Sequence, residues 1–213
     1  VRLEDSRLLT GGGRYVDDIR LPGTAYAYVL RSPHAHARLV AIRTDKAKSA
    51  PGVLVVLTGA DWQAGNFGDL PSPAGRRTRR DGAPMYRPAY PALARDRVRW
   101  VGDPVAFVVA ETRHQAADAA ELIEVDYEPL PAVTSAVEAI KDGAPRLHDD
   151  CPNNICFVHL LGDKAAAEAA FAKADRVVSH TFYVNRVTAA SMEPRGCIGS
   201  YRSEEHTSEL QSH

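Results

Sequence analysis

The clearest hydrophobic pattern in the chain lies between residues 99 and 133. Val105–Ala110 is an unbroken apolar run rich in β-branched side chains, which predicts a strand buried on both faces. His114–Ile123 contains neither glycine nor proline and repeats apolar residues at helical spacing. From residue 123 to 128 apolar and acidic residues alternate, which predicts a half-buried strand. We therefore expect a strand, a helix and a strand, with a right-handed crossover if the two strands are parallel neighbours.

The predicted helix has its own start signal and an alanine-rich inner face. Thr112 offers a hydroxyl cap and Gln115 stands three residues later, a capping-box spacing that is worth about 1 kcal/mol. Because the inner face consists mostly of alanine, the helix must lie close against the element that it covers. The residues expected on that face are Ala116, Ala119, Ala120 and Ile123, and those expected in water are Glu111, Arg113, Asp118 and Glu121.

Shorter elements surround this unit. From Trp62 to Arg97 glycine, proline, serine and arginine dominate, which predicts a long loop of the kind that is functional or mobile. The basic cluster Arg76–Arg80 has no interleaved aromatic residues, so we expect a solvated or partner-facing loop rather than a nucleic-acid surface. The remaining predicted elements are strands at 25–30, within 31–44, at 53–57 and at 176–184, and helices at 45–50, 135–141 and 164–174.

Composition excludes several classes of protein. With 213 residues, 45% of them hydrophobic and 25% charged, the chain has the make-up of a globular protein with one sizeable domain and part of another. The formal net charge of -1 gives no electrostatic case for binding nucleic acid or a membrane. No apolar run approaches the ~20 residues that span a bilayer, and no signal peptide opens the chain. The three cysteines favour a reducing compartment, so we expect a cytoplasmic location.

Two motifs have both a structural and a chemical interpretation. Gly11–Gly13 offers consecutive amides that can bind an anion, but no strand precedes it and no lysine follows at Walker spacing. A turn that lets the backbone pass close to a neighbour is favoured.

His34 and His36 stand two residues apart, so on an extended chain they point the same way and can share a metal. Without a third ligand nearby in the sequence, a hydrogen-bonded structural pair is favoured.

Two further motifs involve sulfur and paired charges. The spacing of Cys151 and Cys156 is similar to that in iron–sulfur proteins, but the further cysteines that a plant-type cluster needs are missing, which favours two ordinary thiols. Glu193 and Arg195 are either an acid–base couple or a buried ion pair, and the ion pair is favoured. The glycine motifs of a serine-hydrolase elbow and of a dinucleotide-binding turn are both absent, which excludes those two classes.

Several separated segments resemble the large subunit of the molybdenum hydroxylases, the family of xanthine dehydrogenases, aldehyde oxidases and aerobic carbon monoxide dehydrogenases. The resemblance covers nearly the whole stretch from residue 2 to residue 201. The segments that carry it are a glycine-rich turn followed by Arg14-Tyr15 and Asp17-Asp18, then Arg31–Ala37, Val101–Val133 and Met192–Gly196.

The resemblance implies a fold and a domain arrangement. We expect an α+β fold, with an α/β-hammerhead domain of mixed sheet over residues 1–147, in which residues 1–13 form an N-terminal arm. Residues 153–201 are then the start of the first molybdopterin-binding domain. Residues 202–213 do not continue the family pattern, so we expect a foreign or disordered tail. Because the chain starts at Val1 rather than methionine, we expect a processed or incomplete sequence.

The resemblance also implies an oxidoreductase. Such an enzyme inserts water-derived oxygen into an aldehyde or an N-heterocycle, or oxidises CO, with molybdopterin in the large subunit and iron–sulfur clusters and FAD on partner subunits or domains. In this family the cofactor-contacting residues lie beyond the position of Glu193. We therefore assign no catalytic, cofactor-binding or metal residue in this chain, and expect it to be inactive and free of molybdenum by itself. Met192–Gly196 favours the carbon monoxide dehydrogenase-like and aldehyde oxidase-like branches.

Two further expectations complete the interpretation. The alternative function is a non-catalytic scaffold or protein-interaction domain that has the same fold, since a fold does not determine a function. The hydrophobic face of the partial second domain lacks its packing partner, so we also expect the isolated chain to be poorly soluble or to associate with itself.

Overall fold

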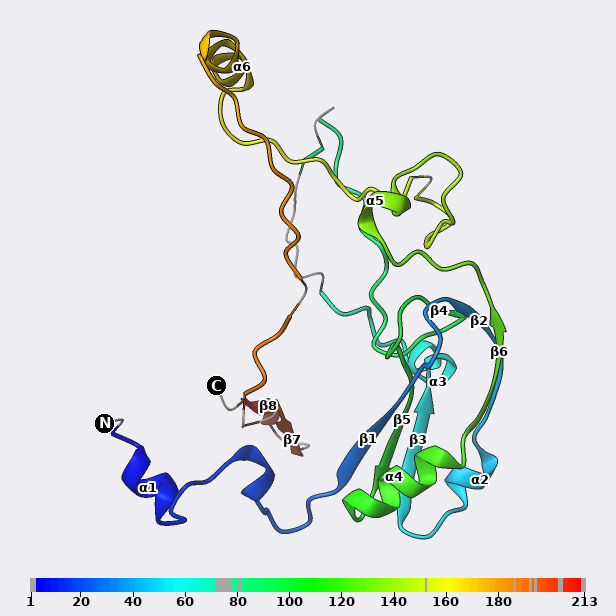
Figure 1. Ribbon diagram of the computed structural model, residues 1–213. Helices are drawn as coiled ribbons and strands as arrows, with labels where there is room; N and C mark the ends of the chain where they lie inside the picture. The colour runs from blue at the N-terminus through cyan, green and yellow to red at the C-terminus, as the bar shows by residue number, and fades with distance from the viewer. Residues whose placement is uncertain are drawn as a thin grey trace. The chain divides into compact units, whose positions relative to one another are not determined.

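Figure 1 shows a computed structural model of the chain, which describes residues 3–71, 78–79, 82–151, 153–185, 187–191, 193, 195–202 and 205–211. The contacts between residues divide the chain into two compact units. One unit is continuous, Ala25–Ala166, and the other combines Val1–Thr24 with Ala167–His213. The boundary predicted between residues 147 and 153 separates two domains of the family. The division by contacts between residues does not test it, so it stays a prediction.

Two small sheets organise the Ala25–Ala166 unit. Every strand pair within them is antiparallel. The first sheet has the order β1 (Tyr26–Arg31), β5 (Pro104–Ala110) and β3 (Val53–Thr58). The second sheet has the order β4 (Arg97–Val98), β2 (Ala37–Arg43) and β6 (Glu124–Pro129). The α+β class is confirmed, but the expected mixture of strand directions is replaced by antiparallel pairing.

The predicted strand–helix–strand unit is present, but its two strands belong to different sheets. β5 is followed by α4 (Arg113–Glu121) and then by β6, as Figure 1 shows. β5 is paired along both edges, with β1 and with β3, so no edge is left for β6, which pairs with β2. The condition for a right-handed parallel crossover is therefore not met, and α4 connects two sheets rather than two neighbouring strands.

The alanine face of α4 is buried as the sequence predicts. Ala116, Ala119 and Ala120 are at most 1% exposed, and Ile123 is 7% exposed. The face packs against the first sheet in a cluster that includes Ala106 and Val108 of β5, together with Ala47 and Val56. Because an alanine side chain ends at Cβ, the helix and the sheet approach each other closely.

The predicted start of α4 is also confirmed. The Thr112 Oγ1 accepts a hydrogen bond from the backbone N–H of Gln115 at 3.2 Å and donates one to the Gln115 Oε1 at 2.9 Å. The hydroxyl thus satisfies one of the four free N–H groups of the first turn and also holds the glutamine side chain in place.

A second buried cluster joins the start of β5 to the second sheet. Val105 is buried together with Val98, and the cluster is completed by Ala37 and Ala94. Ile42 of β2 and Val125 of β6 pack against both clusters, so the two sheets share one hydrophobic interior.

Three short helices accompany the sheets. α2 (Asp45–Lys48) and α5 (Ala136–Ala139) confirm two predicted helices with shorter bounds. α3 (Gly59–Ala64) was not predicted. The carboxylate of Asp61 accepts hydrogen bonds from the Thr58 backbone N–H at 2.7 Å and from its hydroxyl at 2.6 Å. This is a capping box closed by aspartate, so the Thr-x-x-Asp pattern was the signal available in the sequence.

The unit made of Val1–Thr24 and Ala167–His213 contains few regular elements. They are α1 (Asp5–Leu9), a 3₁₀ turn (Val16–Asp18), most of α6 (Lys164–Lys173) and a hairpin of β7 (Cys197–Arg202) and β8 (Glu205–Gln211). α6 confirms the helix predicted at 164–174.

Two expectations for this unit are corrected. Residues 176–184 form no strand, since they make no strand pairing with a described segment, and their side chains are exposed. Residues 205–211 form β8 where disorder was expected. Disorder was expected because these residues show no apolar period. Pairing with β7, however, uses main-chain hydrogen bonds, which do not require such a period. The foreign origin of residues 202–213 stays a prediction.

Candidate functional site

The best-defined polar site of the Ala25–Ala166 unit surrounds the turn that leads into β5. Asp103 is 5% exposed, and its Oδ2 accepts a hydrogen bond from the backbone N–H of Arg99 at 2.9 Å. The Asp103 carbonyl accepts the N–H of Ser32 at 2.9 Å, and the Ser32 carbonyl accepts the N–H of Gly102 at 2.8 Å. Gly102 has a φ of +94°, which favours glycine. The Gly-Asp-Pro sequence therefore folds as a tight turn that is bound to the β1–β2 connection.

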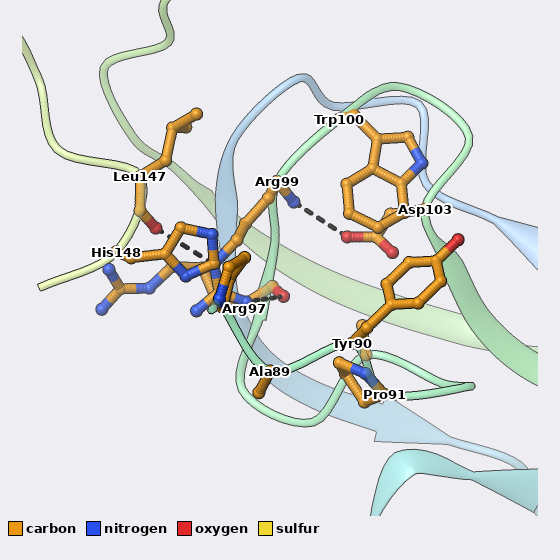
Figure 2. A pocket seen from close by; sticks show the side chains of 11 residues that line it. Ala89, Tyr90, Pro91, Arg97, Arg99, Trp100, Asp103, Leu147 and His148 are labelled. Atoms are coloured by element: carbon orange, nitrogen blue, oxygen red, sulfur yellow. Dashed lines mark hydrogen bonds between the residues drawn. The ribbon is translucent and has the colours of Figure 1, made fainter. Parts of the chain in front are cut away.

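A cavity of about 330 Å³ lies beside this turn (Figure 2). Tyr90 and Trp100 lie on one side of it, with ring centroids 6.4 Å apart, and Arg97 and His148 lie on the other. Prolines, alanines and Leu147 complete a lining that is mostly apolar. The volume is at the lower end of the range of small-molecule sites, and a few polar groups in an apolar cavity are typical of such sites.

Two arginines of this lining have hydrogen-bond donors that the protein does not satisfy. The Arg99 Nε donates to the Leu147 carbonyl at 3.0 Å, and its Nη1 donates to the Arg97 carbonyl at 3.4 Å. Because a guanidinium has five N–H donors, three of those of Arg99 have no acceptor among the described residues. Arg97 pairs with Asp149 at 3.2 and 3.3 Å, while its Nε is buried without a described hydrogen-bond partner.

Burial shifts the pKa values of the other titratable groups near the cavity. Desolvation raises the pKa of the Asp103 carboxyl, while the hydrogen bond from the Arg99 backbone and the Arg99 charge oppose this effect. Desolvation lowers the pKa of His148, and the charge of Arg99 adds to the shift. The lowered pKa favours the neutral imidazole of His148, and the two guanidinium groups carry positive charge in the lining.

The histidine pair has a structural role. The His36 Nδ1 donates to the Pro131 carbonyl at 2.7 Å, which attaches the start of β2 to the segment after β6. His34 packs its ring against Tyr127, with centroids 4.7 Å apart. Among the described residues no group of three or more histidine, cysteine, aspartate or glutamate side chains is placed to hold a metal ion. The His36 hydrogen bond and the His34 ring contact support the favoured structural interpretation.

The cysteines are ordinary thiols. Cys151, Cys156 and Cys197 are all free, and only Cys151 is buried. Desolvation, followed by the neighbouring Cys151, raises the pKa of the Cys156 thiol, which makes it less reactive. The iron–sulfur alternative is therefore not supported by this part of the chain.

In the other unit the glycine triplet ends α1. The Gly12 N–H donates to the Arg7 carbonyl at 2.8 Å and the Gly11 N–H donates to the Leu8 carbonyl at 3.3 Å, while Gly11 has a φ of +74°. This is a Schellman motif. A Cβ at Gly13 would collide with the side chain of Leu8, so the favoured interpretation as a close-packed turn is confirmed.

Glu193 binds a backbone amide rather than Arg195. Its Oε1 accepts a hydrogen bond from the N–H of Val16 at 3.1 Å, at the start of the 3₁₀ turn. Arg195 is exposed, and no ion pair joins the two side chains, both of which the structure describes. The favoured ion pair is therefore wrong, because the carboxylate finds its donor in a segment 177 positions earlier. A Cβ at Gly196 would collide with the side chain of Val16, so the two segments are in close contact.

Sequence reasoning missed most of the cavity. No motif of the sequence singled out Arg97, Arg99 or His148. These residues come from loops, which have no hydrophobic period, and Arg99 is 48 positions from the Leu147 carbonyl that it binds. The basic cluster Arg76–Arg80 lies mostly outside the described residues.

Two family models match successive parts of the chain. Residues 10–131 match the model described as aldehyde oxidase and xanthine dehydrogenase, a/b hammerhead domain. Residues 147–213 match the model described as molybdopterin cofactor-binding domain. The described part of the chain contains no helix long and apolar enough to cross a membrane.

Similar proteins are considerably longer than this chain. The carbon monoxide dehydrogenase large chain of Afipia carboxidovorans is 39% identical over 93% of this chain and 25% of its own length. The nicotine 6-hydroxylase large subunit of Paenarthrobacter nicotinovorans is 38% identical over 94% of this chain and 23% of its own. The crystal structure of quinoline 2-oxidoreductase from Pseudomonas putida 86 superposes with a TM-score of 0.78 at 39% identity, over 96% of this chain and 25% of that one. The chain thus spans about a quarter of the length of these proteins.

Proposed function

Because this chain belongs to the aldehyde oxidase and xanthine dehydrogenase family, we propose that it is the amino-terminal part of the large, molybdopterin-binding subunit of a molybdenum-dependent oxidoreductase. One observation supports this most strongly: a hammerhead match and a cofactor-domain match follow each other over residues 10–131 and 147–213. A free-standing scaffold made of the hammerhead alone would not contain the second match.

The described residues of this chain do not enclose a molybdopterin. The Glu193 carboxylate is already bound to the Val16 amide, and Arg195 is exposed. In the proposed enzyme the cofactor supplies the oxygen-transfer and redox chemistry. The hammerhead domain is then a structural support, and the cofactor contacts lie in later parts of the subunit.

The proposed reaction is hydroxylation of an aldehyde or an N-heterocycle with water-derived oxygen, or oxidation of CO. The names of the relatives support both, since they include a carbon monoxide dehydrogenase, a nicotine hydroxylase and a quinoline oxidoreductase. We propose iron–sulfur and FAD subunits or domains as partners, because two of these relatives are large chains of multi-subunit enzymes. We also propose a cytoplasmic location, because the three cysteines favour a reducing compartment.

Molybdenum analysis tests the proposal. The 213-residue chain, purified alone, is expected to contain no molybdenum and to oxidise neither CO nor quinoline with a dye as acceptor. The complete large subunit, expressed from its full reading frame with its neighbouring genes, is expected to contain stoichiometric molybdenum and to reduce the dye. Stoichiometric molybdenum in the 213-residue chain, or its absence from the complete complex, would contradict the proposal.

The DNA that follows the codon of residue 201 separates the enzyme from the scaffold. We expect an open reading frame that continues with the glycine-rich cofactor segments of the family. A genuine stop codon directly after this point would favour the non-catalytic scaffold.

A further inference from the structure

The cavity beside the β4–β5 turn has unsatisfied donors in an apolar enclosure. Arg97 and Arg99 both line it. The Arg97 Nε is buried without a described hydrogen-bond partner, whereas the Arg99 N–H groups without an acceptor among the described residues are not buried. Buried donors in native proteins are nearly always satisfied, and an exception indicates a missing acceptor such as a bound anion or water. The Arg97 Nε therefore lacks an oxygen acceptor at the cavity.

The acidic groups nearby do not supply that acceptor. Asp149 is bound to the terminal nitrogens of Arg97, and its side chain is 80% exposed. The Asp150 carboxylate accepts the hydroxyl of Tyr86 at 2.5 Å. The Asp103 Oδ2 accepts the backbone N–H of Arg99 at 2.9 Å.

The apolar part of the lining restricts which anion is suitable. Tyr90 and Trp100 form an aromatic wall, and prolines and Leu147 surround it. A phosphate would place several charged oxygens against these surfaces without donors, which is costly. A carboxylate presents two oxygens at one end, in the geometry that a guanidinium binds best, and the rest of the ligand can be apolar.

We propose that this cavity is a binding site for a small monocarboxylate with a flat apolar body, held by the guanidinium of Arg99 with Arg97 beside it and by the rings of Trp100 and Tyr90. The site lies within the Ala25–Ala166 unit, and none of its residues takes part in the proposed function of the subunit. A test of ligand binding in this cavity therefore does not depend on whether the subunit is part of a molybdenum enzyme.

Tryptophan fluorescence provides a direct test with the 213-residue chain. The chain has two tryptophans, and Trp62 lies away from the cavity, with its indole N–H donating to the Gly68 carbonyl. In a Trp62→Phe background Trp100 is the sole tryptophan, and benzoate is titrated at low protein concentration. We expect a saturable change in Trp100 emission, with binding at least tenfold weaker for benzyl alcohol and for inorganic phosphate.

Variants assign the binding to the cavity. Arg99→Gln in the same background is expected to weaken benzoate binding at least tenfold, whereas Arg38→Gln, which removes an equal charge from the exposed ion pair with Glu128, leaves it unchanged. Circular dichroism checks that each variant is folded. If Arg99→Gln does not fold, Trp100→Leu replaces it, with binding measured by calorimetry and the same loss expected. A non-saturating signal, equal binding of benzyl alcohol or phosphate, or equal affinity of both arginine variants would overturn the proposal.

Discussion

Gly59 lies at a position where the neighbouring backbone leaves no room for a side chain. It begins α3, and a Cβ at this position would collide with the backbone carbonyl of Ala94. A backbone segment of the buried core cannot move aside as the end of a flexible side chain can. The close approach of α3 to the segment before β4 therefore depends on the absence of a side chain at residue 59.

We predict that Gly59→Ala lowers the free energy of unfolding by about 1–3 kcal/mol, the usual cost of overpacking. Gly68→Ala is the matched control, because a Cβ added at Gly68 would have no neighbouring atom within 4 Å, and its effect should stay within about 0.5 kcal/mol. Urea denaturation followed by circular dichroism measures both. Equal stability of the two variants would show that α3 does not pack as described.

Asp61 gives the same helix a pH dependence. The hydrogen bond from the Thr58 hydroxyl lowers the pKa of Asp61 below its ordinary value, although partial burial opposes the shift. A carboxylate with a lowered folded-state pKa stabilises the fold above its unfolded pKa of about 3.9, and this contribution is lost as the pH falls through the folded-state pKa.

We therefore predict that Asp61→Asn destabilises the chain at pH 7 and that the difference from the parent shrinks as the pH is lowered below about 4. Denaturation midpoints at pH 7 and at acidic pH measure the effect. Asp118→Asn, on the exposed face of α4, is the charge-matched control. An Asp61→Asn deficit that is the same at both pH values would contradict the assigned hydrogen bond.

At the scale of elements, α4 determines how closely the first sheet is covered. Its inner face is alanine, and Ala119 is completely buried against the cluster that includes Ala106 and Val108. Because the interface has no spare volume, a larger side chain must push the helix away from the sheet.

Ala119→Leu is predicted to lower the unfolding free energy by about 1–3 kcal/mol. Ala117→Leu makes the same chemical change at a half-buried position of the same helix and should cost clearly less. Thermal or urea unfolding compares the two variants. If the costs were equal, the alanine face of α4 would not be the packed one.

Helices and strands of the Ala25–Ala166 unit were predictable where a single segment of the sequence contained the complete hydrophobic pattern. β5, α4 and β6 follow from the spacing of Val105–Tyr127 because each pattern is local. Their sheet partners were not predictable, because pairing of β6 with β2 depends on residues about 80 positions away. The strand expected at 176–184 did not form, although its residues alternate between apolar and polar. Alternation alone does not make a strand, because a hydrogen-bond ladder also needs a second strand as its partner.

The candidate site was harder to predict from the sequence than the fold was. The Gly-Asp-Pro sequence contains a recognisable turn signal, because glycine permits a positive φ and proline fixes φ. The guanidinium groups of Arg97 and Arg99 had no such signal, since an arginine in a loop has no pattern that distinguishes a buried donor from a solvated one. The partner of Glu193 was unpredictable for a related reason, because it is a backbone amide and any residue has one.

At the scale of the whole molecule, several large apolar side chains have no cover. Val178, Phe182 and Tyr183 are 91%, 80% and 94% exposed, and they lie in a segment without a strand partner among the described residues. An extended apolar segment with unpaired main-chain groups readily pairs with another copy of itself.

We predict that the purified 213-residue chain self-associates in a concentration-dependent way, as measured by light scattering. The double variant Val178→Ser and Phe182→Ser is expected to raise the concentration at which association begins, since it removes exposed apolar area. A monodisperse monomer at all concentrations would contradict the prediction.

The hydrogen bond between Val16 and Glu193 also has a consequence for synthesis on the ribosome. Its two partners are separated by 177 positions. At about 5–20 residues per second, the amide waits roughly 9–35 s before its carboxylate has even been polymerised. The whole Ala25–Ala166 unit is synthesised in that interval. Its sheets can therefore form while the leading end of the nascent chain is still without its final partner, which exposes that end to chaperones and proteases until translation has nearly reached residue 200.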